Sequence, residues 1–434
     1  MKSLTKIERA WVMYDWADSV YSTIMLAAVF PVFFVGIAGG DGTPGSMWWG
    51  IGNSVANLLV GLLAPLLGAL GQFASYKKRL WLMFLLLGVV FTFGAAFMAT
   101  WQLLLFFYVV SRIGHAGAFK VYDMFLPDVT TKERMDRVSA MGYAMGYIGG
   151  STIPFVASIA LILFGDQVGI DTVLATRISI IITAVWWAIF SVPMWRHVHN
   201  PHAQLLPPGG KLALYKTTWR HTLATGQKIW REPAMRYFIV AYFLYIDGVG
   251  TVIAMATAFG AEIGLSTNDM IVALFLTQLI AFPFSSWAAK LSDRIGSIKT
   301  IIVAIMIYFV ICVVGFLMGF GIEEAWFGLD TATLLFFVLA ALVGTVQGGI
   351  QAISRSTFGK LVPPEKAGSY FGFFEIFGRF ATVIGPGMYA LVLGISGRAS
   401  FAILSVVSVF FAGLIIMLKG RRVIEAQYYA EAPH

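Results

Sequence analysis

The chain has little charge and almost no cysteine. Charged residues make up 12% of its 434 residues, whereas a soluble globular domain carries roughly 25%. Cys312 is the single cysteine and lies in an apolar run, so no intrachain disulfide can form and a packing role is expected. The sequence also offers no nucleophile motif, phosphate-binding loop or metal-ligand spacing. These features argue against a soluble domain and against an enzyme, and they predict neither a cofactor nor a metal.

Apolar sequence dominates instead, with 59% hydrophobic residues and a mean hydropathy of +0.80. A helix needs about 20 mostly apolar residues to cross a bilayer. The first run is too long for a signal-peptide core and lacks a small-residue cleavage site, so we expect it to be the first crossing. The sequence predicts an all-α integral membrane protein with twelve transmembrane segments, at residues 13–37, 47–71, 80–99, 102–126, 138–164, 173–195, 234–260, 268–289, 299–320, 331–354, 368–394 and 399–418.

Lys and Arg residues gather at the two ends of the chain and between alternate pairs of these segments, while the other connections are short and acidic. Because positive residues accumulate in cytoplasmic loops, this pattern predicts that both termini are cytoplasmic. It also explains the net charge of +8 without a nucleic-acid partner. Outside the long central loop, the clusters are Lys2, Lys6 and Arg9; Lys77, Lys78 and Arg79; Lys132, Arg134 and Arg137; Lys290, Arg294 and Lys299; Arg355, Lys360 and Lys366; and Lys419, Arg421 and Arg422.

The longest loop divides the chain into two sets of six crossings. Its first part is rich in Pro and Gly, which is typical of a linker. Apolar residues from Leu212 to Trp230 fall on one helical arc, which predicts an amphipathic helix on the inner membrane surface or packed under the bundle. The predicted organisation is an N-terminal six-helix half (1–195), a cytoplasmic linker (196–233), a C-terminal six-helix half (234–420) and a cytoplasmic tail (421–434).

Two loops repeat one pattern: residues 289–299 read AKLSDRIGSIK, and residues 68–77 read GALGQFASYK. Both resemble the loop signature G-x-L-x-D-R-x-G-x-(R/K) of the major facilitator superfamily, although Gln72 replaces the usual Asp. An acidic residue there can cap a helix and pair with a basic partner, so we expect Asp293 to form the stronger latch. The predicted cytoplasmic gate residues are Gln72, Lys77, Asp128, Arg137, Asp293, Arg294 and Arg355.

Further strings narrow the resemblance. They are YDWA at 14–17, LPD at 126–128 followed by RVS at 137–139, YIDG at 245–248 and QGGIQAISRS at 347–356. Together they resemble the autophagy-related vacuolar amino-acid effluxer branch of the superfamily, which includes bacterial members. The resemblance implies two pseudo-symmetric six-helix halves that rock about a central cavity, and amino-acid export in the fungal relatives. Because the long inserts expected of a fungal vacuolar protein are lacking, we expect a bacterial inner-membrane protein.

Charges inside the crossings are the main candidates for function, because each costs roughly 2.5–3.5 kcal/mol at mid-membrane. Arg112 lies near the middle of its segment and shares a helical face with Asp123, with His115 and Lys120 to either side. This arrangement predicts a site for a substrate anion or a proton. A structural ion pair that holds the helix to a neighbour is the alternative. Arg112 also resembles the fourth-crossing arginine that is linked to proton coupling in the superfamily.

Other candidates lie on four further segments. Asp15 and Asp18 are one turn apart, and like-charged neighbours suit a proton site, although Asp15 could be a structural contact. Glu375 and Arg379 are at i,i+4, so they could simply neutralise each other or separate in one state. The remaining candidates for substrate or proton binding are Asp247, Tyr245, Gln347 and Gln351, and interhelical hydrogen bonding is the alternative for the glutamines.

The sequence therefore predicts a secondary transporter of a small polar or zwitterionic, amino-acid-like solute, working by alternating access, coupled to protons and exporting. A multidrug or organic-ion exporter on the same fold is the alternative, since aromatic residues reach 15%. Charges within crossings of both halves argue against a receptor or scaffold. We expect the partners to be the solute, protons and the lipid bilayer, and the protein to be a monomer.

Overall fold

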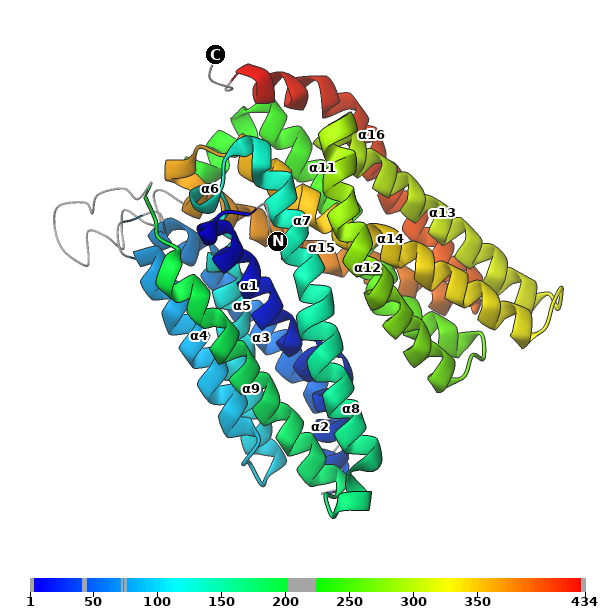
Figure 1. Cartoon of the computed structure of the whole chain (residues 1–434). Coiled ribbons are helices and arrows are strands. Elements are labelled where there is room, and N and C mark those ends of the chain that lie inside the picture. Colours follow the sequence, from blue (N-terminus) through cyan, green and yellow to red (C-terminus); the bar gives the residue numbers. More distant parts are fainter. Residues whose placement is uncertain (1–3, 41–44, 72, 74–75, 202–223, 431–434) are drawn as a thin grey trace. The chain divides into compact units, whose positions relative to one another are not determined.

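The computed structural model describes residues 4–40, 45–71, 73, 76–201 and 224–430, and its elements are all helices (Figure 1). Packing divides the chain into two compact units. Unit 1 comprises Met1–Lys132, Met145–Thr225 and Val362–Glu375, and unit 2 comprises Glu133–Ala144, Gly226–Leu361 and Ile376–His434. The division falls within the connection between the fourth and fifth predicted crossings. Residues up to Lys132 belong to unit 1, and Glu133–Ala144, which include the start of the fifth crossing, belong to unit 2.

Unit 1 is a bundle of long helices. They are α1 (Lys6–Tyr21), continued by a π-helical segment (Ser22–Ala28) into α2 (Val29–Gly40), then α3 (Gly45–Gly71), α4 (Tyr76–Ala95), α5 (Trp101–Asp123), the short α6 (Leu126–Val129), α8 (Ile153–Phe164) and α9 (Thr172–His197). Helix α4 packs on α5 and α9, α3 packs on α5, and α1 packs on α9 (Figure 1). The interior is aromatic: Trp11, Tyr14, Tyr21 and Trp187 are fully buried.

Unit 2 is built from α11 (Pro233–Glu262), α12 (Thr267–Ile295), α13 (Ser297–Glu323), α14 (Leu329–Leu361), α16 (Ala399–Ala430), most of α7 (Met135–Gly146) and the second part of α15 (Ala367–Ser396). Helix α12 packs along α14, α11 along α16, and α13 along both α14 and α16. The long helices of this unit therefore bury their facing sides against one another.

Local sequence sets where several helices begin. Thr5 and Glu8 form a capping box at the start of α1, in which each side chain bonds the other's backbone N–H. Asp171 Oδ1 accepts from Leu174 N at 2.7 Å and caps α9. Gly296 has a φ of 90°, which only glycine adopts readily, so the chain can turn there from α12 directly into α13.

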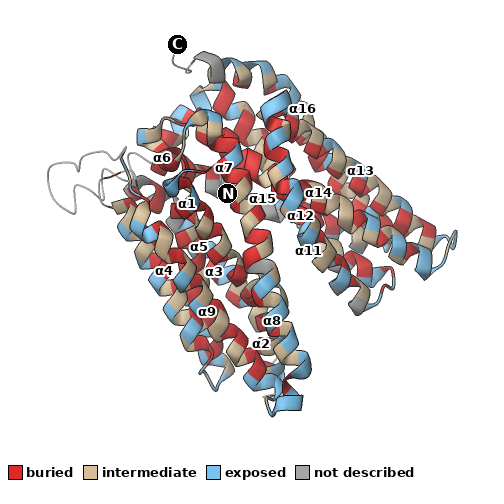
Figure 2. Cartoon of the chain, viewed as in Figure 1, coloured by how far each residue is buried: buried red, intermediate tan, exposed pale blue. Residues whose placement is uncertain are grey.

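Within the described ranges, ten helices are long and apolar enough to cross a membrane. Many positions along these helices are exposed (Figure 2). Large apolar side chains are among them, such as Val32 at 74%, Val90 at 59% and Leu334 at 64%. Such exposed side chains are unfavourable in water and match a lipid environment. The prediction of an all-α membrane protein is confirmed, while the count of twelve crossings and the side of the termini stay predictions. Residues 202–223, which hold most of the predicted amphipathic helix, lie outside the described residues.

Candidate functional site

A chain of polar side chains joins α1 to α5 inside unit 1. His115 Nε2 lies 3.0 Å from Asp18 Oδ2, and His115 Nδ1 lies 3.1 Å from Arg112 Nη1. Tyr14 donates to the other oxygen of Asp18 at 3.3 Å. Asp18 and His115 are 3% and 5% exposed, so their contact is shielded from solvent. Arg112 and His115 can meet because residues three apart on a helix are neighbours.

The two hydrogen-bond partners of His115 determine which of its ring nitrogens carries the hydrogen. A guanidinium can only donate, so His115 Nδ1 must accept from Arg112. The ring therefore carries its hydrogen on Nε2 and donates it to Asp18. The three groups form a cation, a neutral bridge and an anion, with no net charge. A second proton on the ring would break the bond to Arg112 and bring two cations into contact.

Aromatic rings enclose the histidine. Tyr21 stacks on it with centroids 4.2 Å apart, and Trp187 meets it edge-on at 5.6 Å. Exclusion of water lowers the local dielectric, which strengthens the contact with Asp18. Arg112 is only half-buried, and its Nε has no hydrogen-bond partner among the residues that the structure describes. Arg112 thus keeps donors for a further anionic group.

Asp15 has different surroundings from Asp18. Tyr122 donates to Asp15 Oδ2 at 2.7 Å, and the Tyr122 ring stacks on Trp11 at 4.3 Å. This contact favours the structural alternative for Asp15, because it ties α1 to α5. Lys120 is buried in α5, and Asp123 is half-buried at its last position.

A buried ion pair joins α4 to α6. Lys77 Nζ lies 2.6 Å from Asp128 Oδ2 and donates to Met124 O at 3.1 Å. The side chains are 2% and 0% exposed, so neither charge has solvent to stabilise it. The two residues were predicted as gate residues, and the structure brings them together within unit 1.

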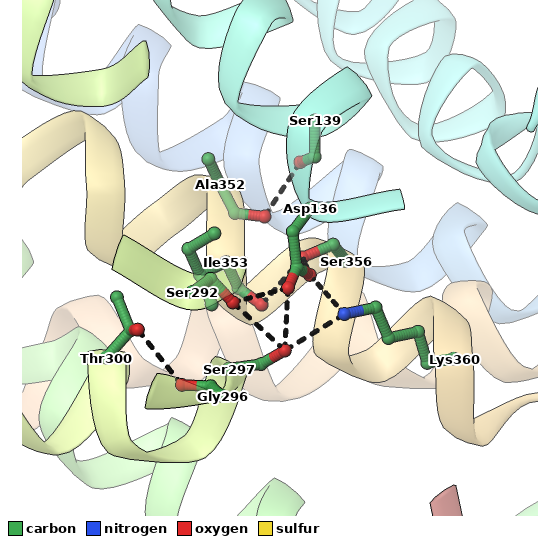
Figure 3. Close-up of polar contacts among 10 residues, drawn as sticks. All are labelled: Asp136, Ser139, Ser292, Gly296, Ser297, Thr300, Ala352, Ile353, Ser356 and Lys360. Atoms are coloured by element: carbon green, nitrogen blue, oxygen red, sulfur yellow. Dashed lines mark hydrogen bonds and ion pairs between the residues drawn. The ribbon is translucent and has the colours of Figure 1, made fainter. Parts of the chain in front are cut away.

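Unit 2 holds a second buried cluster, centred on Asp136 at the start of α7 (Figure 3). Lys360 Nζ lies 2.6 Å from Asp136 Oδ1, and Ser356 donates to the same oxygen at 2.5 Å. Ser292 and Ser297 donate to Oδ2 at 2.5 and 2.7 Å. Each carboxylate oxygen thus has two partners, which offsets the cost of burying the charge.

One turn further along α7, Ser139 meets Arg355 of α14. Arg355 donates from Nε to Ser139 Oγ at 2.9 Å and from Nη2 to Ser139 O at 3.1 Å. Ser139 donates in turn to Ala352 O at 2.7 Å (Figure 3). The guanidinium also lies 4.5 Å from the centre of the Tyr143 ring. The start of α7 is therefore fastened to α14 over two helical turns.

Helix α11 carries a carboxylate in an unusual position. Asp247 is fully buried, and no described side chain donates a hydrogen bond to its carboxylate, which lies near the backbone N–H groups of Ile384 and Gly385 on α15. An unpaired charge there would cost several kcal/mol, so Asp247 is a candidate for binding a proton or a cation. Nearby, Tyr245 donates to Ser354 Oγ at 2.6 Å, since Ser354 gives its own hydrogen to Ile350 O.

An apolar cavity of about 100 Å³ lies among α11, α12, α13, α14 and α16. Gln278 and Gln347 provide amide groups in its wall, and none of its lining residues is ionisable. Gln351 does not line it and instead donates to Gln347 O at 3.1 Å. The cavity suits a neutral apolar group better than a charged one.

The profile of the family described as "Vacuole effluxer Atg22 like" matches residues 49–422. The chain belongs to this family. An uncharacterized MFS-type transporter, YxiO of Bacillus subtilis, is 39% identical over 424 residues, which cover 96% of this chain and 95% of that protein. Autophagy-related protein 22 of Yarrowia lipolytica is 26% identical over 325 residues, or 67% of this chain. The matched residues cover 52% of that fungal relative, so the chain spans about half of its length.

Solved structures agree on the fold of this Atg22-like chain. The proton:xylose symporter XylE has a TM-score of 0.72 at 12% identity, with 95% of both chains covered. The human organic anion transporter MFSD10 has a TM-score of 0.69 at 14% identity, with 95% of this chain and 99% of that one covered. The predicted resemblance is therefore confirmed: the chain is an Atg22-like membrane transporter of the major facilitator superfamily.

Several predicted gate residues of the Atg22-like chain lie at its surface or outside the described residues. Arg137, Asp293 and Arg294 are exposed, and within the described residues neither Asp293 nor Arg294 has an ion pair. The latch expected of Asp293 stays a prediction; its exposed side chain lies outside the packed surface that Ser292 and Ser297 provide. Gln72 and the side chains of Glu375 and Arg379 lie outside the described residues.

Sequence reasoning missed the Asp136 cluster. It selected the neighbouring Arg137 and counted Lys360 only as a basic loop residue. The signal was the spacing of Asp136, Ser139, Ala140 and Tyr143, which is the i, i+3, i+4, i+7 pattern of one helical face. That face is the buried one, and Arg137 lies off it.

Proposed function

We propose that this chain is a proton-coupled exporter of zwitterionic, amino-acid-like solutes. In this proposal it works as a monomer by alternating access in a bacterial inner membrane, with twelve crossings, cytoplasmic termini and moving halves at 1–195 and 234–420. The observation that carries it is the buried series Arg112–His115–Asp18 between α1 and α5. The word "effluxer" in the family's description supports the direction.

The series presents a cation and an anion joined by a neutral ring. A zwitterion has the two complementary ends in one molecule: its carboxylate suits the guanidinium of Arg112, and its ammonium suits the carboxylate of Asp18. In binding, the solute takes over the bridge that His115 forms in the empty site. The net charge of the buried site stays zero throughout, which avoids the cost of an uncompensated charge.

Protons compete with such a solute. A proton taken up by the Asp18–His115 pair removes either the anion that holds the ammonium or the acceptor that holds Arg112. The pair therefore binds a proton or a solute, but not both. Alternation between the two is the requirement for exchange, in which protons entering the cell drive the solute out. The charged groups facing His115 in this scheme are Asp18 and Arg112, with Tyr21 stacked on its ring.

Reconstituted vesicles can test this scheme through counterflow of radiolabelled amino acids at several pH values. We expect apparent affinity to fall as the pH is lowered, and Asp18→Asn and Arg112→Gln each to lose transport at least tenfold. Ser191→Ala is the matched control, because Ser191 is buried in the same unit and its hydroxyl donates to Trp187 O of its own helix. Tighter solute binding at lower pH would contradict the scheme, because it would show that proton and solute bind together. Unchanged transport in both variants would show that Asp18 and Arg112 do not form the solute-binding site.

An exporter of lipophilic compounds is the second candidate, because the cavity beside Gln278 and Gln347 is apolar and has no ionisable lining residue. In that case Gln278→Leu and Gln347→Leu would change which neutral compounds are carried, while Arg112→Gln would leave transport intact. A screen of neutral and zwitterionic solutes by thermal stabilisation of the purified protein separates the two candidates.

A further inference from the structure

A groove on unit 2 lies beside the turn between α12 and α13. Its volume is about 180 Å³, and its walls come from α12, α13 and α14. Apolar side chains dominate the walls, among them Trp287, Leu291, Val303 and Ile350. Phe284 and Trp287 are 37% and 53% exposed, so the groove is open at the surface of the unit.

The position of the groove indicates what covers it. Val272–Ile295 and Ser297–Glu323 are both long and apolar enough to cross a membrane, and Gly296 joins them. The turn at Gly296 therefore lies at a membrane surface, and the groove begins within two helical turns of it. Exposed tryptophan is typical of this boundary. An apolar groove at this depth faces acyl chains.

The same end of the groove carries positive charge. Lys290, Arg294 and Lys299 are exposed, and none of them has an ion pair among the described residues. Asp293 is the exposed acid between them. Three unpaired bases at the mouth of an apolar groove complement a molecule with an anionic head and an aliphatic tail.

We propose that this groove binds an anionic phospholipid of the surrounding membrane. One acyl chain lies between α12, α13 and α14, and the phosphate meets Lys290, Arg294 and Lys299. The proposal is independent of which solute is transported.

The bound lipid also acts on the Asp136 cluster. Thr300 lines the groove and donates to Gly296 O at 3.0 Å, next to Ser297 (Figure 3). Ser297 and Ser292, on either side of that turn, both donate to Asp136. A lipid that holds the turn in place thereby holds the two hydroxyls that fasten α7.

Native mass spectrometry and thermal unfolding of the full-length protein test the proposal, with phosphatidylglycerol and phosphatidylcholine as probes. We expect phosphatidylglycerol to bind and stabilise in preference. A triple variant, Lys290→Gln with Arg294→Gln and Lys299→Gln, should lose about fivefold in affinity per charge removed, since each base near the surface contributes about 1 kcal/mol. The matched control is Lys6→Gln with Arg9→Gln, which removes exposed bases from α1 in unit 1.

A second variant, Thr345→Trp, fills the groove without changing charge, since Thr345 lines it. It should abolish phosphatidylglycerol binding but leave transport-competent protein. Equal losses in the triple variant and the control would overturn the proposal. So would equal binding of phosphatidylcholine, or equally tight binding of glycerol 3-phosphate, which has the anionic head and no chain.

Discussion

At the scale of single residues, the buried pair Lys77–Asp128 shows how this chain keeps charge inside an apolar bundle. Lys77 also donates to a backbone carbonyl, so the ammonium has more than one acceptor. Such a pair adds little stability over apolar residues, yet loss of one partner leaves an uncompensated buried charge. The same reasoning applies to the series Arg112–His115–Asp18, where the imidazole separates the two charges.

We predict that Lys77→Met lowers the free energy of unfolding by about 3–5 kcal/mol, because it removes one partner of a buried ion pair, the cation 2.6 Å from Asp128 Oδ2. The double variant Lys77→Met with Asp128→Asn should recover most of this loss. Chemical unfolding in detergent measures both. The control is Arg421→Gln, which breaks a partly exposed i,i+4 pair with Glu425 and should cost less than about 0.5 kcal/mol. Equal costs for the two single variants would contradict the argument.

Gly385 offers a second test at this scale. A Cβ at this position would overlap Thr251 Oγ1 and lie 2.8 Å from Asp247 Oδ2. We therefore expect Gly385→Ala to destabilise the protein by about 1–3 kcal/mol, since the backbone of α15 would have to move. Gly387→Ala is the control, because no atom lies within 4 Å of its Cβ position. This control should be neutral or stabilising by up to about 1 kcal/mol, as thermal unfolding can measure, and the reverse order would refute the contact.

At the scale of elements, α7 is the helix whose role the sequence reveals least. Its apolar content predicts a crossing, and the structure confirms a helix there. The partners of Asp136 come from positions 292, 297, 356 and 360, which are more than 150 residues away in the chain. Ser292, Ser297 and Ser356 lie near helix ends, where a single serine carries no periodic signal, so pattern alone could not select them. Lys77 and Asp128, in contrast, belong to recognisable strings, and the structure pairs them.

We predict that Asp136→Asn loosens the start of α7. It removes the anion that lies 2.6 Å from Lys360 Nζ, at a site where both side chains are at most 11% exposed. A loss of about 3 kcal/mol corresponds to about 100-fold faster exchange, which hydrogen exchange should detect at amides 133–144 and not in α16. Asp293→Asn changes an exposed carboxylate next to Ser292 and should leave exchange unaltered. Uniformly faster exchange across unit 2 would mean that Asp136 supports the whole unit rather than α7.

At the scale of the whole molecule, composition was enough to predict an all-helical membrane protein, because low charge and long apolar runs permit few other folds. The family followed from short strings such as QGGIQAISRS at 347–356, which the match over residues 49–422 bears out. The side of the membrane that each loop faces depends on charge statistics alone. That part of the prediction needs its own measurement.

The topology can be tested with single cysteines, because the chain has one native cysteine and it is buried. In a Cys312→Ala background, we expect Asp166→Cys and Asp330→Cys to react with an impermeant maleimide in intact cells. Asp293→Cys and Arg422→Cys should react only after permeabilisation, since they lie in the basic loops and tail. All four positions are exposed, so differences in labelling report the side of the membrane rather than burial. Labelling of position 422 in intact cells would place the C-terminal tail outside and would reverse the predicted orientation of the chain in the membrane.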